Sequence, residues 1–362
     1  MDSALREELV TLTTELVRFA SIADRPDQLA ACSDYVAAYL NSIPGIFVER
    51  SEAGGKPAIV ATLHATRTPA LMLNGHLDVV VGRPEQFVPV VRDGRIYGRG
   101  AQDMKGSCAV MLRLLRDLAA HPARPDVGFQ FVCDEEIGGA QGTGRLLTEG
   151  WRCDFMLCLE PTDMGILFAH KGGMWVDLRL PGHPAHGSRP WDGHNPVRDL
   201  AHGLVALEAH YPVPAGPHEW RTTVTPTLLH SGAGSRNQIA PAVQATFDIR
   251  WTGDDTPERI LATLSACFPG SEVLAVDSCM PLYTDPEHPA VGRVAELLAQ
   301  RLGTTPRFYR EHFATDARYY TSAGIPAICV GPVGAGLHAD DEWVSIDSLV
   351  DLYHVLLAYA TT

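Results

Sequence analysis

The feature that most constrains the fold of this chain is a series of short, nearly continuous apolar runs separated by stretches of helical periodicity. The runs are IFVER, AIVATL, ALMLN, VGFQFVC and DFMLCLE. Apolar residues at spacings of three and four precede them in 3–19 and 27–41, and the same spacing appears again at 110–118. Apolar strands that alternate with helices are typical of a sheet covered on both faces. We therefore predict an α/β fold with a mostly parallel sheet and helices on both faces.

The order of the predicted elements changes between residues 173 and 281. This segment is predicted to contain a strand, a helix, two strands, a helix and a short strand. The order β-α-β-β-α-β is that of a small split-βαβ domain. The first pattern resumes afterwards, with a helix at 289–302 and a closing helix. We expect one domain formed by 1–172 and 282–362, interrupted by an inserted α+β domain at 173–281.

Composition argues against several classes of partner. The net charge is −14, and no basic stripe is visible that could neutralise phosphates, so we expect no nucleic-acid binding. No stretch approaches the roughly 18 apolar residues of a membrane span. The first twenty residues mix acids and bases, unlike a signal peptide. The 8 cysteines include no CxxC pair, so we expect a reduced, cytoplasmic protein without membrane contact.

Five side chains that suit hard divalent metals each follow one of the apolar or strand-like runs. They are His76, Asp103, Glu136, Glu160 and His338. In an open α/β sheet the carboxyl ends of the strands converge on one crevice, so these residues can meet there. Imidazoles and carboxylates are suitable ligands for zinc and its neighbours, and a bridging carboxylate would allow two metals. Each residue alone has an ordinary structural explanation, and spacing does not decide between the two.

Two further carboxylates lie beside this set. Asp78 follows His76 by two residues on the same predicted strand, so both side chains point to one side and Asp78 can orient the imidazole. Glu135 directly precedes Glu136 and remains as a carboxylate near the metals. A water between two metals needs a base within hydrogen-bond reach, which makes Glu135 the candidate general base.

Five motifs of the chain, in this order, resemble those of the dinuclear-zinc deacylases and carboxypeptidases. They are GHLDVV, GRGAQDMKGS, CDEEIGG, LEPTD and LHADDEW. This family includes acetylornithine deacetylase, succinyl-diaminopimelate desuccinylase, aminoacylase and glutamate carboxypeptidase, and the similarity spans nearly the whole chain. It implies two divalent metals per chain, Zn²⁺ or Co²⁺, with a hydroxide bridged between them.

The resemblance also implies how the metals are shared among the ligands. Asp103 would bridge both metals. His76 and Glu160 would complete one site, and Glu136 and His338 the other. The peptide bond that follows Asp103 matches a non-proline cis bond of the family.

For the inserted domain, the resemblance implies a role as a lid and in dimerisation. His186 matches a histidine that family members present to the substrate carbonyl, in dimeric members from the partner subunit. A hydrated loop histidine is the plain alternative. The chain is therefore expected to form a homodimer through the inserted domain.

Three further positions match family residues that contact substrate: Asn237, Arg250 and Thr315. A guanidinium can bind a carboxylate through two parallel hydrogen bonds, so Arg250 suits an amino-acid carboxylate. A strand-end ion pair explains Arg250 equally well. The neighbour of Thr315, Asp316, can equally be the N-cap of a helix at 317–322.

These observations together predict an amidohydrolase that removes the acyl group from N-acyl amino acids. A carboxypeptidase or dipeptidase acting on short peptides is the alternative within the family. A dinucleotide-binding oxidoreductase would rest on GAGLHA, which lacks the apolar helix that should follow it. A serine hydrolase needs a G-x-S-x-G elbow, which the chain lacks. A non-catalytic binding protein would not need Glu135.

Overall fold

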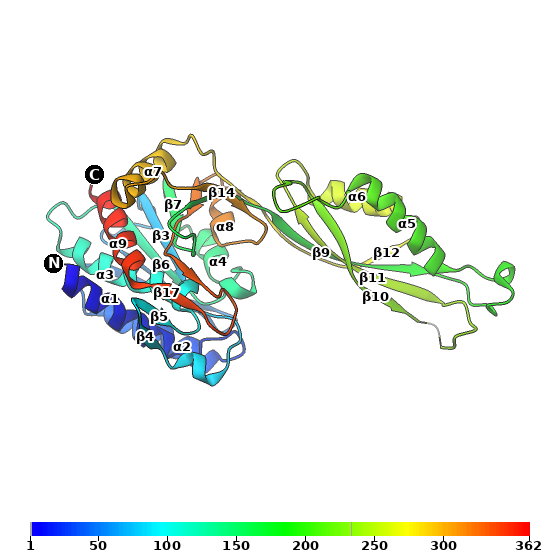
Figure 1. The fold of residues 1–362 in the computed structure, drawn as a ribbon, viewed down its shortest axis with the longest axis horizontal. Coiled ribbons are helices and arrows are strands. Elements are labelled where there is room, and N and C mark those ends of the chain that lie inside the picture. Colours follow the sequence, from blue (N-terminus) through cyan, green and yellow to red (C-terminus); the bar gives the residue numbers. More distant parts are fainter. Residues whose placement is uncertain (1, 233) are drawn as a thin grey trace. The chain divides into compact units, whose positions relative to one another are not determined.

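The computed structural model describes residues 2–232 and 234–362, and the chain divides into two compact units (Figure 1). The first unit is built from the residues up to Ala169 together with Leu282–Arg310 and Thr315–Thr362. The second unit contains His170–Pro281 and Glu311–Ala314. It begins at His170 rather than at 173 and ends at Pro281. The inclusion of the segment Glu311–Ala314 in this unit was not predicted.

A nine-stranded sheet forms the centre of the first unit. Its strands, in spatial order, are β1 (Phe47–Ala53), β2 (Lys56–Thr62), β6 (Val127–Val132), β3 (Leu71–His76), β7 (Phe155–Cys158), β15 (Ala327–Cys329), β8 (Ile166–His170) and β13 (Leu282–Tyr283), with β14 (Phe308–Glu311) paired to β8. The central strands β6, β3, β7 and β15 run parallel, as predicted. The pairs β1–β2, β2–β6 and β15–β8 are antiparallel, which was not predicted. Strands β1 and β2 are joined by only two glycines, and so short a connection can only reverse the chain.

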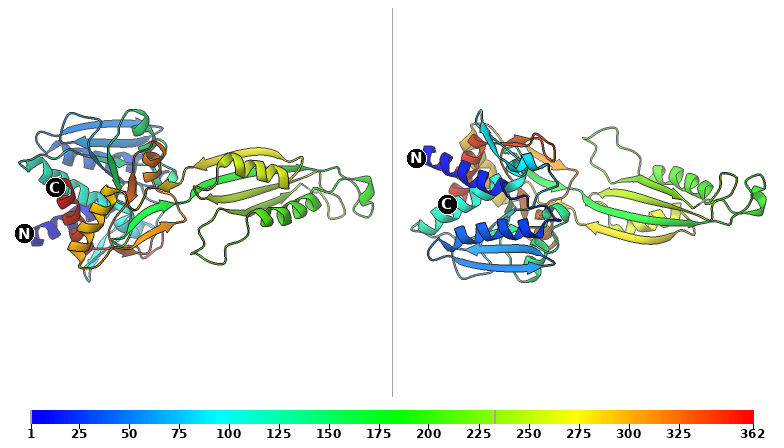
Figure 2. Two further views of the ribbon diagram at one scale, coloured as in Figure 1. Left: turned by 90° about the horizontal axis from the view of Figure 1, so that it is seen from above. Right: turned by 90° about the horizontal axis from the view of Figure 1, so that it is seen from below.

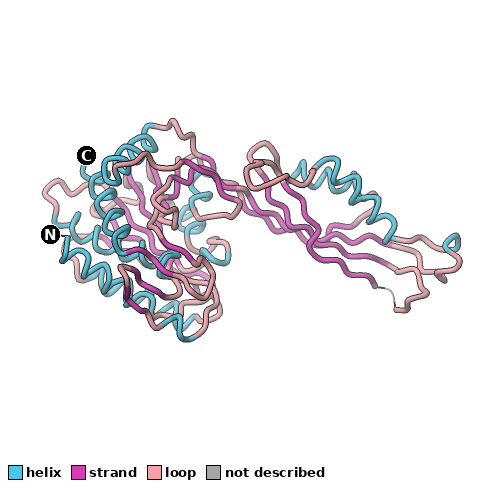
Figure 3. Tube along the Cα trace, in the orientation of Figure 1, coloured by secondary structure: helices cyan, strands magenta, loops and turns pink. Residues whose placement is uncertain are grey.

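Helices cover both faces of this sheet (Figures 1 and 3). One layer contains α1 (Asp2–Val17), α2 (Pro26–Asn41), α3 (Gly106–Ala120), α7 (Pro289–Leu302) and α9 (Ile346–Thr361), and the other contains α4 (Thr143–Thr148) and α8 (Ala317–Ser322). Successive side chains of a strand point to opposite faces of the sheet. Met72 of β3 accordingly packs with Leu146 of α4 and Tyr320 of α8, while Gly75 faces Met111 of α3. In the described part of the chain, no helix is both long and apolar enough to span a membrane.

A small antiparallel sheet completes the first unit. Its strands are β16 (Gly334–Ala335), β17 (Trp343–Ser345), β5 (Arg95–Tyr97) and β4 (Val90–Arg92). Because β5 and β17 are paired, the loop after β5 lies beside the loop that precedes β17. The backbone N–H of Gly98 donates to the carbonyl of Glu342 at 3.0 Å. This pairing matters for the site, since Asp103 follows one strand and His338 precedes the other.

The second unit has the predicted element order β-α-β-β-α-β. Its elements are β9 (Gly172–Pro181), α5 (Pro196–His210), β10 (Thr223–Ser231), β11 (Ala242–Trp251), α6 (Pro257–Cys267) and β12 (Glu272–Cys279). The antiparallel sheet has the order β10-β11-β9-β12, and α5 and α6 lie side by side over it (Figure 2). Alternate residues of β9 and β11 are buried against these helices, the pattern of a sheet covered on one face.

The core of the second unit gives a direct test of this arrangement. Phe247 of β11 is fully buried beneath the helices, whereas Leu228 of β10 is 66% exposed. Replacing Phe247 with Ala should lower the free energy of unfolding of this unit by roughly 3–5 kcal/mol, because it removes apolar contacts and leaves a cavity. Hydrogen exchange of the β9 and β11 amides measures this. The control L228A should change it by no more than about 0.5 kcal/mol, and equal effects would contradict the burial pattern.

Candidate metal centre

The metal-binding candidates meet at the carboxyl edge of the parallel strands. His76 ends β3, Glu136 lies four residues beyond β6, and Glu160 lies two residues beyond β7. The register places His76 opposite Val132 of β6, and Asn74 opposite Cys158 of β7. Because these strands are parallel and neighbouring, the residues that follow them reach the same edge of the sheet. The fold thus gathers residues that are far apart in the sequence.

Asp103 lies between the two histidines. Its Oδ1 is 3.0 Å from Nε2 of His76, and its Oδ2 is 3.3 Å from Nε2 of His338. The two oxygens of one buried carboxylate therefore face two different imidazoles. A carboxylate that bridges two metals must present its oxygens in this way.

One glutamate accompanies each histidine. Oε1 of Glu160 is 3.9 Å from Nε2 of His76, and Oε2 of Glu136 is 3.3 Å from Nε2 of His338. Ligands of a tetrahedral zinc with bonds of about 2.0–2.1 Å lie roughly 3.3 Å apart. The observed separations, 3.0–3.9 Å, fit such a centre. The ligand atoms of His76, Asp103 and Glu136 all lie within 4.8 Å of one another.

Glu135 belongs to the same cluster. Ligand atoms of Glu135, His76 and Glu160 form a second group within 4.8 Å of one another. Burial raises the pKa of Glu135 well above its ordinary value, and the negative charges of Asp316 and Glu136 raise it further. A carboxyl group with a raised pKa is suited to accept and return a proton near neutral pH.

The carboxylates in turn control the protonation of the imidazoles. Hydrogen bonds to Asp103 and Glu136 raise the pKa of His338 to about 10. Burial opposes a charge on His76, but Asp103 and Glu160 outweigh it and raise the pKa of His76 well above its ordinary value. Hydrogen bonds from both imidazoles hold the pKa of Asp103 below its usual range, against the effect of burial.

Asp78 contacts His76 in a different way from that predicted. Nδ1 of His76 lies 2.9 Å from the backbone oxygen of Asp78, while the nearest carboxylate oxygen is 3.6 Å away. The carboxylate instead accepts hydrogen bonds from the backbone N–H groups of Glu135 at 3.3 Å and Glu136 at 3.0 Å. Asp78 therefore links the strand that carries His76 to the loop that carries both glutamates.

The segment around Asp103 has unusual backbone geometry. The peptide bond Asp103–Met104 is cis, as the resemblance implied. It lies in the turn Ala101–Lys105 that precedes α3, and the backbone is not helical at Asp103 (φ −117°, ψ 93°) or Met104 (φ −133°, ψ 33°). Gly100, just before this turn, has φ of +83°, a conformation that favours glycine.

The contacts of the loop that follows Glu136 were not predicted from the sequence. The carbonyl of Gly138, in the loop that follows Glu136, accepts hydrogen bonds from Arg318 Nη2 and from the Tyr319 hydroxyl, both at 2.6 Å.

Asp316 occupies the N-cap position of α8 but makes no capping bond. It accepts instead from the hydroxyl of Thr143 at 2.6 Å. The neighbouring Thr315 is buried, and its hydroxyl lies 3.3 Å from Sγ of Cys329.

The other predicted substrate-contacting residues lie in the second unit. His186 and Asn237 are neighbours, with Nε2 of His186 3.4 Å from Nδ2 of Asn237. Arg250 donates two parallel hydrogen bonds to the carboxylate of Asp248, at 2.8 and 3.1 Å, and stacks over Trp175. The guanidinium thus makes the strand-end ion pair that was the alternative explanation.

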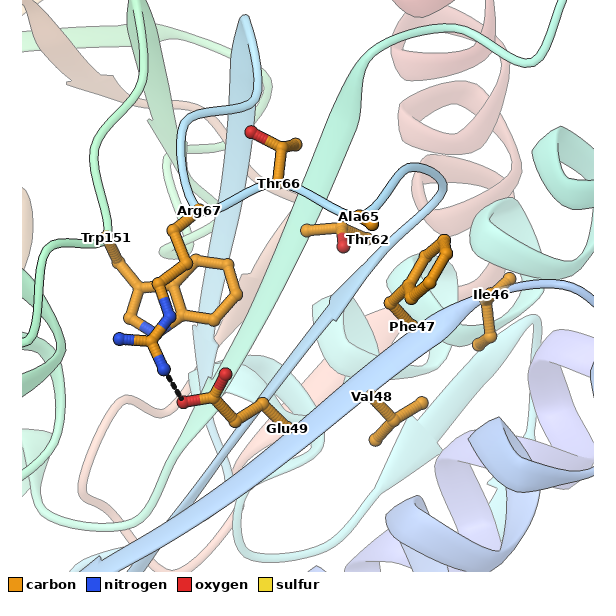
Figure 4. A pocket seen from close by; sticks show the side chains of 9 residues that line it. All are labelled: Ile46, Phe47, Val48, Glu49, Thr62, Ala65, Thr66, Arg67 and Trp151. Carbon is orange, nitrogen blue, oxygen red and sulfur yellow. Dashed lines mark hydrogen bonds and ion pairs between the residues drawn. The ribbon is translucent and has the colours of Figure 1, made fainter.

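One pocket of the first unit is separate from the metal candidates. It encloses about 470 Å³ beside the edge strand β1, and Figure 4 shows Phe47, Arg67 and Trp151 among its lining side chains. Arg67 pairs with Glu49 at 2.6 Å and lies over the ring of Trp151. None of the candidate ligands lines this pocket.

Comparisons with known proteins agree with this geometry. The succinyl-diaminopimelate desuccinylase of Xanthomonas campestris pv. campestris (strain 8004) is 32% identical over 378 residues, which covers 98% of this chain and 99% of that protein. The aminopeptidase PepT of Bacillus cereus ATCC 10987 has a TM-score of 0.78 at 19% identity, with 98% of both chains covered. A dinuclear metal-binding peptidase of the M20 family from Bacillus subtilis has a TM-score of 0.67 at 14% identity, covering 99% of this chain and 98% of that one.

The two solved structures show a shared fold, a mixed α/β architecture with a mostly parallel central sheet. The model of peptidase family M20/M25/M40 matches residues 72–362, which includes every candidate ligand. Since this model and the desuccinylase both cover most of the chain, the protein belongs to peptidase family M20/M25/M40 and is a metal-binding hydrolase of amide bonds.

Proposed function

We propose that the chain hydrolyses the amide bond of N-acyl amino acids with two divalent metal ions, most simply Zn²⁺, with Co²⁺ as a substitute. The observation that carries the proposal is the carboxylate of Asp103, whose two oxygens face the imidazoles of His76 and His338. Glu160 and Glu136 would complete the two ligand sets. Two metal ions in this position would polarise the scissile carbonyl and lower the pKa of a water molecule.

Glu135 is the residue proposed to move the proton. It lies among the ligands, and burial raises its pKa. It would take a proton from the attacking water and return it to the departing amine, so that the products are a carboxylic acid and a free amine. Asp78 accepts a hydrogen bond from the backbone N–H of Glu135, which would hold the loop that carries the base beside the ligands.

The substrate class is inferred from two sources. The desuccinylase similar to this chain is named for removing a succinyl group from an amino acid, which supports the deacylation of N-acyl amino acids. A carboxypeptidase or dipeptidase stays the second candidate, because the family is described as a peptidase family. Contacts of His186, Asn237, Arg250 and Thr315 with substrate, a homodimer formed through the inserted domain and a cytoplasmic location stay predictions.

A substrate panel separates the two candidate functions. The metal-loaded protein should hydrolyse N-acetyl and N-succinyl amino acids faster than dipeptides or tripeptides, with amine release as the readout. Turnover of peptides alone would contradict the deacylase assignment and leave the peptidase in its place.

Removing the proposed base tests the mechanism. Glu135→Gln should lower kcat by about 10²–10⁴-fold, because the amide cannot accept the proton of water. Metal analysis of the same preparation should still find two ions per chain. The control Glu15→Gln, on the exposed face of α1, should leave both values unchanged. Retained turnover in Glu135→Gln would rule out Glu135 as the base.

Metal binding should also release protons. His338, with a pKa of about 10, and His76, with a raised pKa, are both protonated near pH 7.5 in the metal-free protein. An imidazole must lose its proton before it binds a metal, so the apparent affinity should rise with pH. Calorimetric titration in buffers of different ionisation enthalpy counts the protons. Replacing His338 with Ala should reduce the count, and an enthalpy that is independent of the buffer would contradict this prediction.

A further inference from the structure

A buried ion pair joins the two loops that carry Asp103 and His338. Nη1 of Arg99 donates to Oε2 of Glu342 at 2.7 Å, and the two side chains are only 3% and 1% exposed. The loss of hydration for two buried charges is so costly that such a pair adds little net stability. Both side chains of the pair also contact the backbone of a loop that carries a candidate ligand.

The second oxygen of Glu342 holds the backbone at Asp103. Oε1 of Glu342 accepts hydrogen bonds from the backbone N–H groups of Gln102 at 3.0 Å and of Asp103 at 3.2 Å. Hydrogen bonds to an ionised carboxylate are stronger than those between neutral groups. The residue proposed to bridge the two metals is thus fixed at its own N–H by a carboxylate 239 residues away in the sequence.

Arg99 holds the other loop. Its Nη2 donates to the backbone oxygen of His338 at 3.2 Å. His338 has φ of +59°, in the left-handed region that is unfavourable for a residue with a Cβ atom. Gln86 adds to this restraint, because its side chain donates to the carbonyls of Ala339 at 3.2 Å and Asp340 at 3.3 Å.

We propose that Arg99 and Glu342 are positioning residues that set the distance between the Asp103 carboxylate and the His338 imidazole, and hence the affinity of the metal site that these two residues share. This inference rests on the proposed function. One side chain of the pair fixes the backbone of the first ligand and the other fixes the backbone of the second. With both backbones held in this way, Oδ2 of Asp103 lies 3.3 Å from Nε2 of His338.

The shape of the guanidinium explains why lysine cannot replace Arg99. Two nitrogens of Arg99 donate in different directions, one to Glu342 and one to the carbonyl of His338. A lysine ammonium is a compact point charge that cannot reproduce this planar, two-pronged contact. Arg99→Lys therefore keeps the charge and removes the positioning.

The test is a metal titration of the full chain after removal of its metals with a chelator. Arg99→Lys and Glu342→Gln should each weaken binding of Zn²⁺, measured against a competing chelator, by about 10- to 100-fold for at least one of the two ions. The visible absorption spectrum of the Co²⁺-loaded variants should also change, because the ligand geometry around the ion changes. A purely structural role would lower thermal stability without altering this spectrum.

Arg113→Lys is the matched control. Arg113 also makes two ion pairs, with Asp117 at 2.8 Å within α3 and with Glu8 of α1 at 2.6 Å, and neither involves the ligand loops. This variant should lose some thermal stability and keep the metal affinity and Co²⁺ spectrum of the parent.

The outcomes are distinct. Parent-like affinity and spectrum in both Arg99→Lys and Glu342→Gln would overturn the inference. If Glu342→Gln does not fold, Arg99→Lys decides by the same two measurements. A parent chain that binds fewer than two ions would instead contradict the proposed function, and the inference would be lost with it.

Discussion

The structure depends on the convergence of several carboxylates on two imidazoles, of which that of His76 is buried and that of His338 is half exposed. Asp103, Glu136 and Glu160 surround His76 and His338, and Glu135 lies among them. Buried carboxylates repel one another and lose hydration, which is why the pKa values of Glu135 and Glu160 are raised. Divalent cations would relieve both costs at once. The local charge balance thus favours the binding of cations at this centre, and the raised pKa of Glu135 supports its proposed role as the base.

The parallel strands make this convergence possible, and loops refine it. Strands β3, β6 and β7 bring His76 and the two glutamate-bearing loops to one edge of the sheet. The small sheet then pairs β5 with β17, which sets the Asp103 loop beside the His338 loop. Carboxylates with no proposed metal contact, those of Asp78 and Glu342, hold the backbone of these loops through N–H groups. The proposed chemistry therefore also depends on residues that hold the backbone of the ligand loops and would not bind the metals themselves.

Hydrophobic periodicity and the order of the predicted elements were sufficient to predict the main features of the fold. The parallel centre of the sheet and the β-α-β-β-α-β order of the inserted unit follow from local patterns. The placement of His76 beside Asp103 was implied by the resemblance to the family, because spacing alone left it open. Contacts between a side chain and a distant backbone leave no such pattern. For that reason the partners of Asp78, Asp316 and Glu342 could not be foreseen. Arg250 shows a different limit. Its partner Asp248 lies on the same strand, but the spacing alone did not decide between an ion pair and a contact with substrate.

The most direct test of the account is anomalous X-ray diffraction from crystals of the zinc-loaded protein. We expect two anomalous peaks about 3.5–4 Å apart, one on each side of the Asp103 carboxylate. A single peak, or two peaks of which neither contacts Asp103, would contradict the proposal that this carboxylate joins a pair of metal ions.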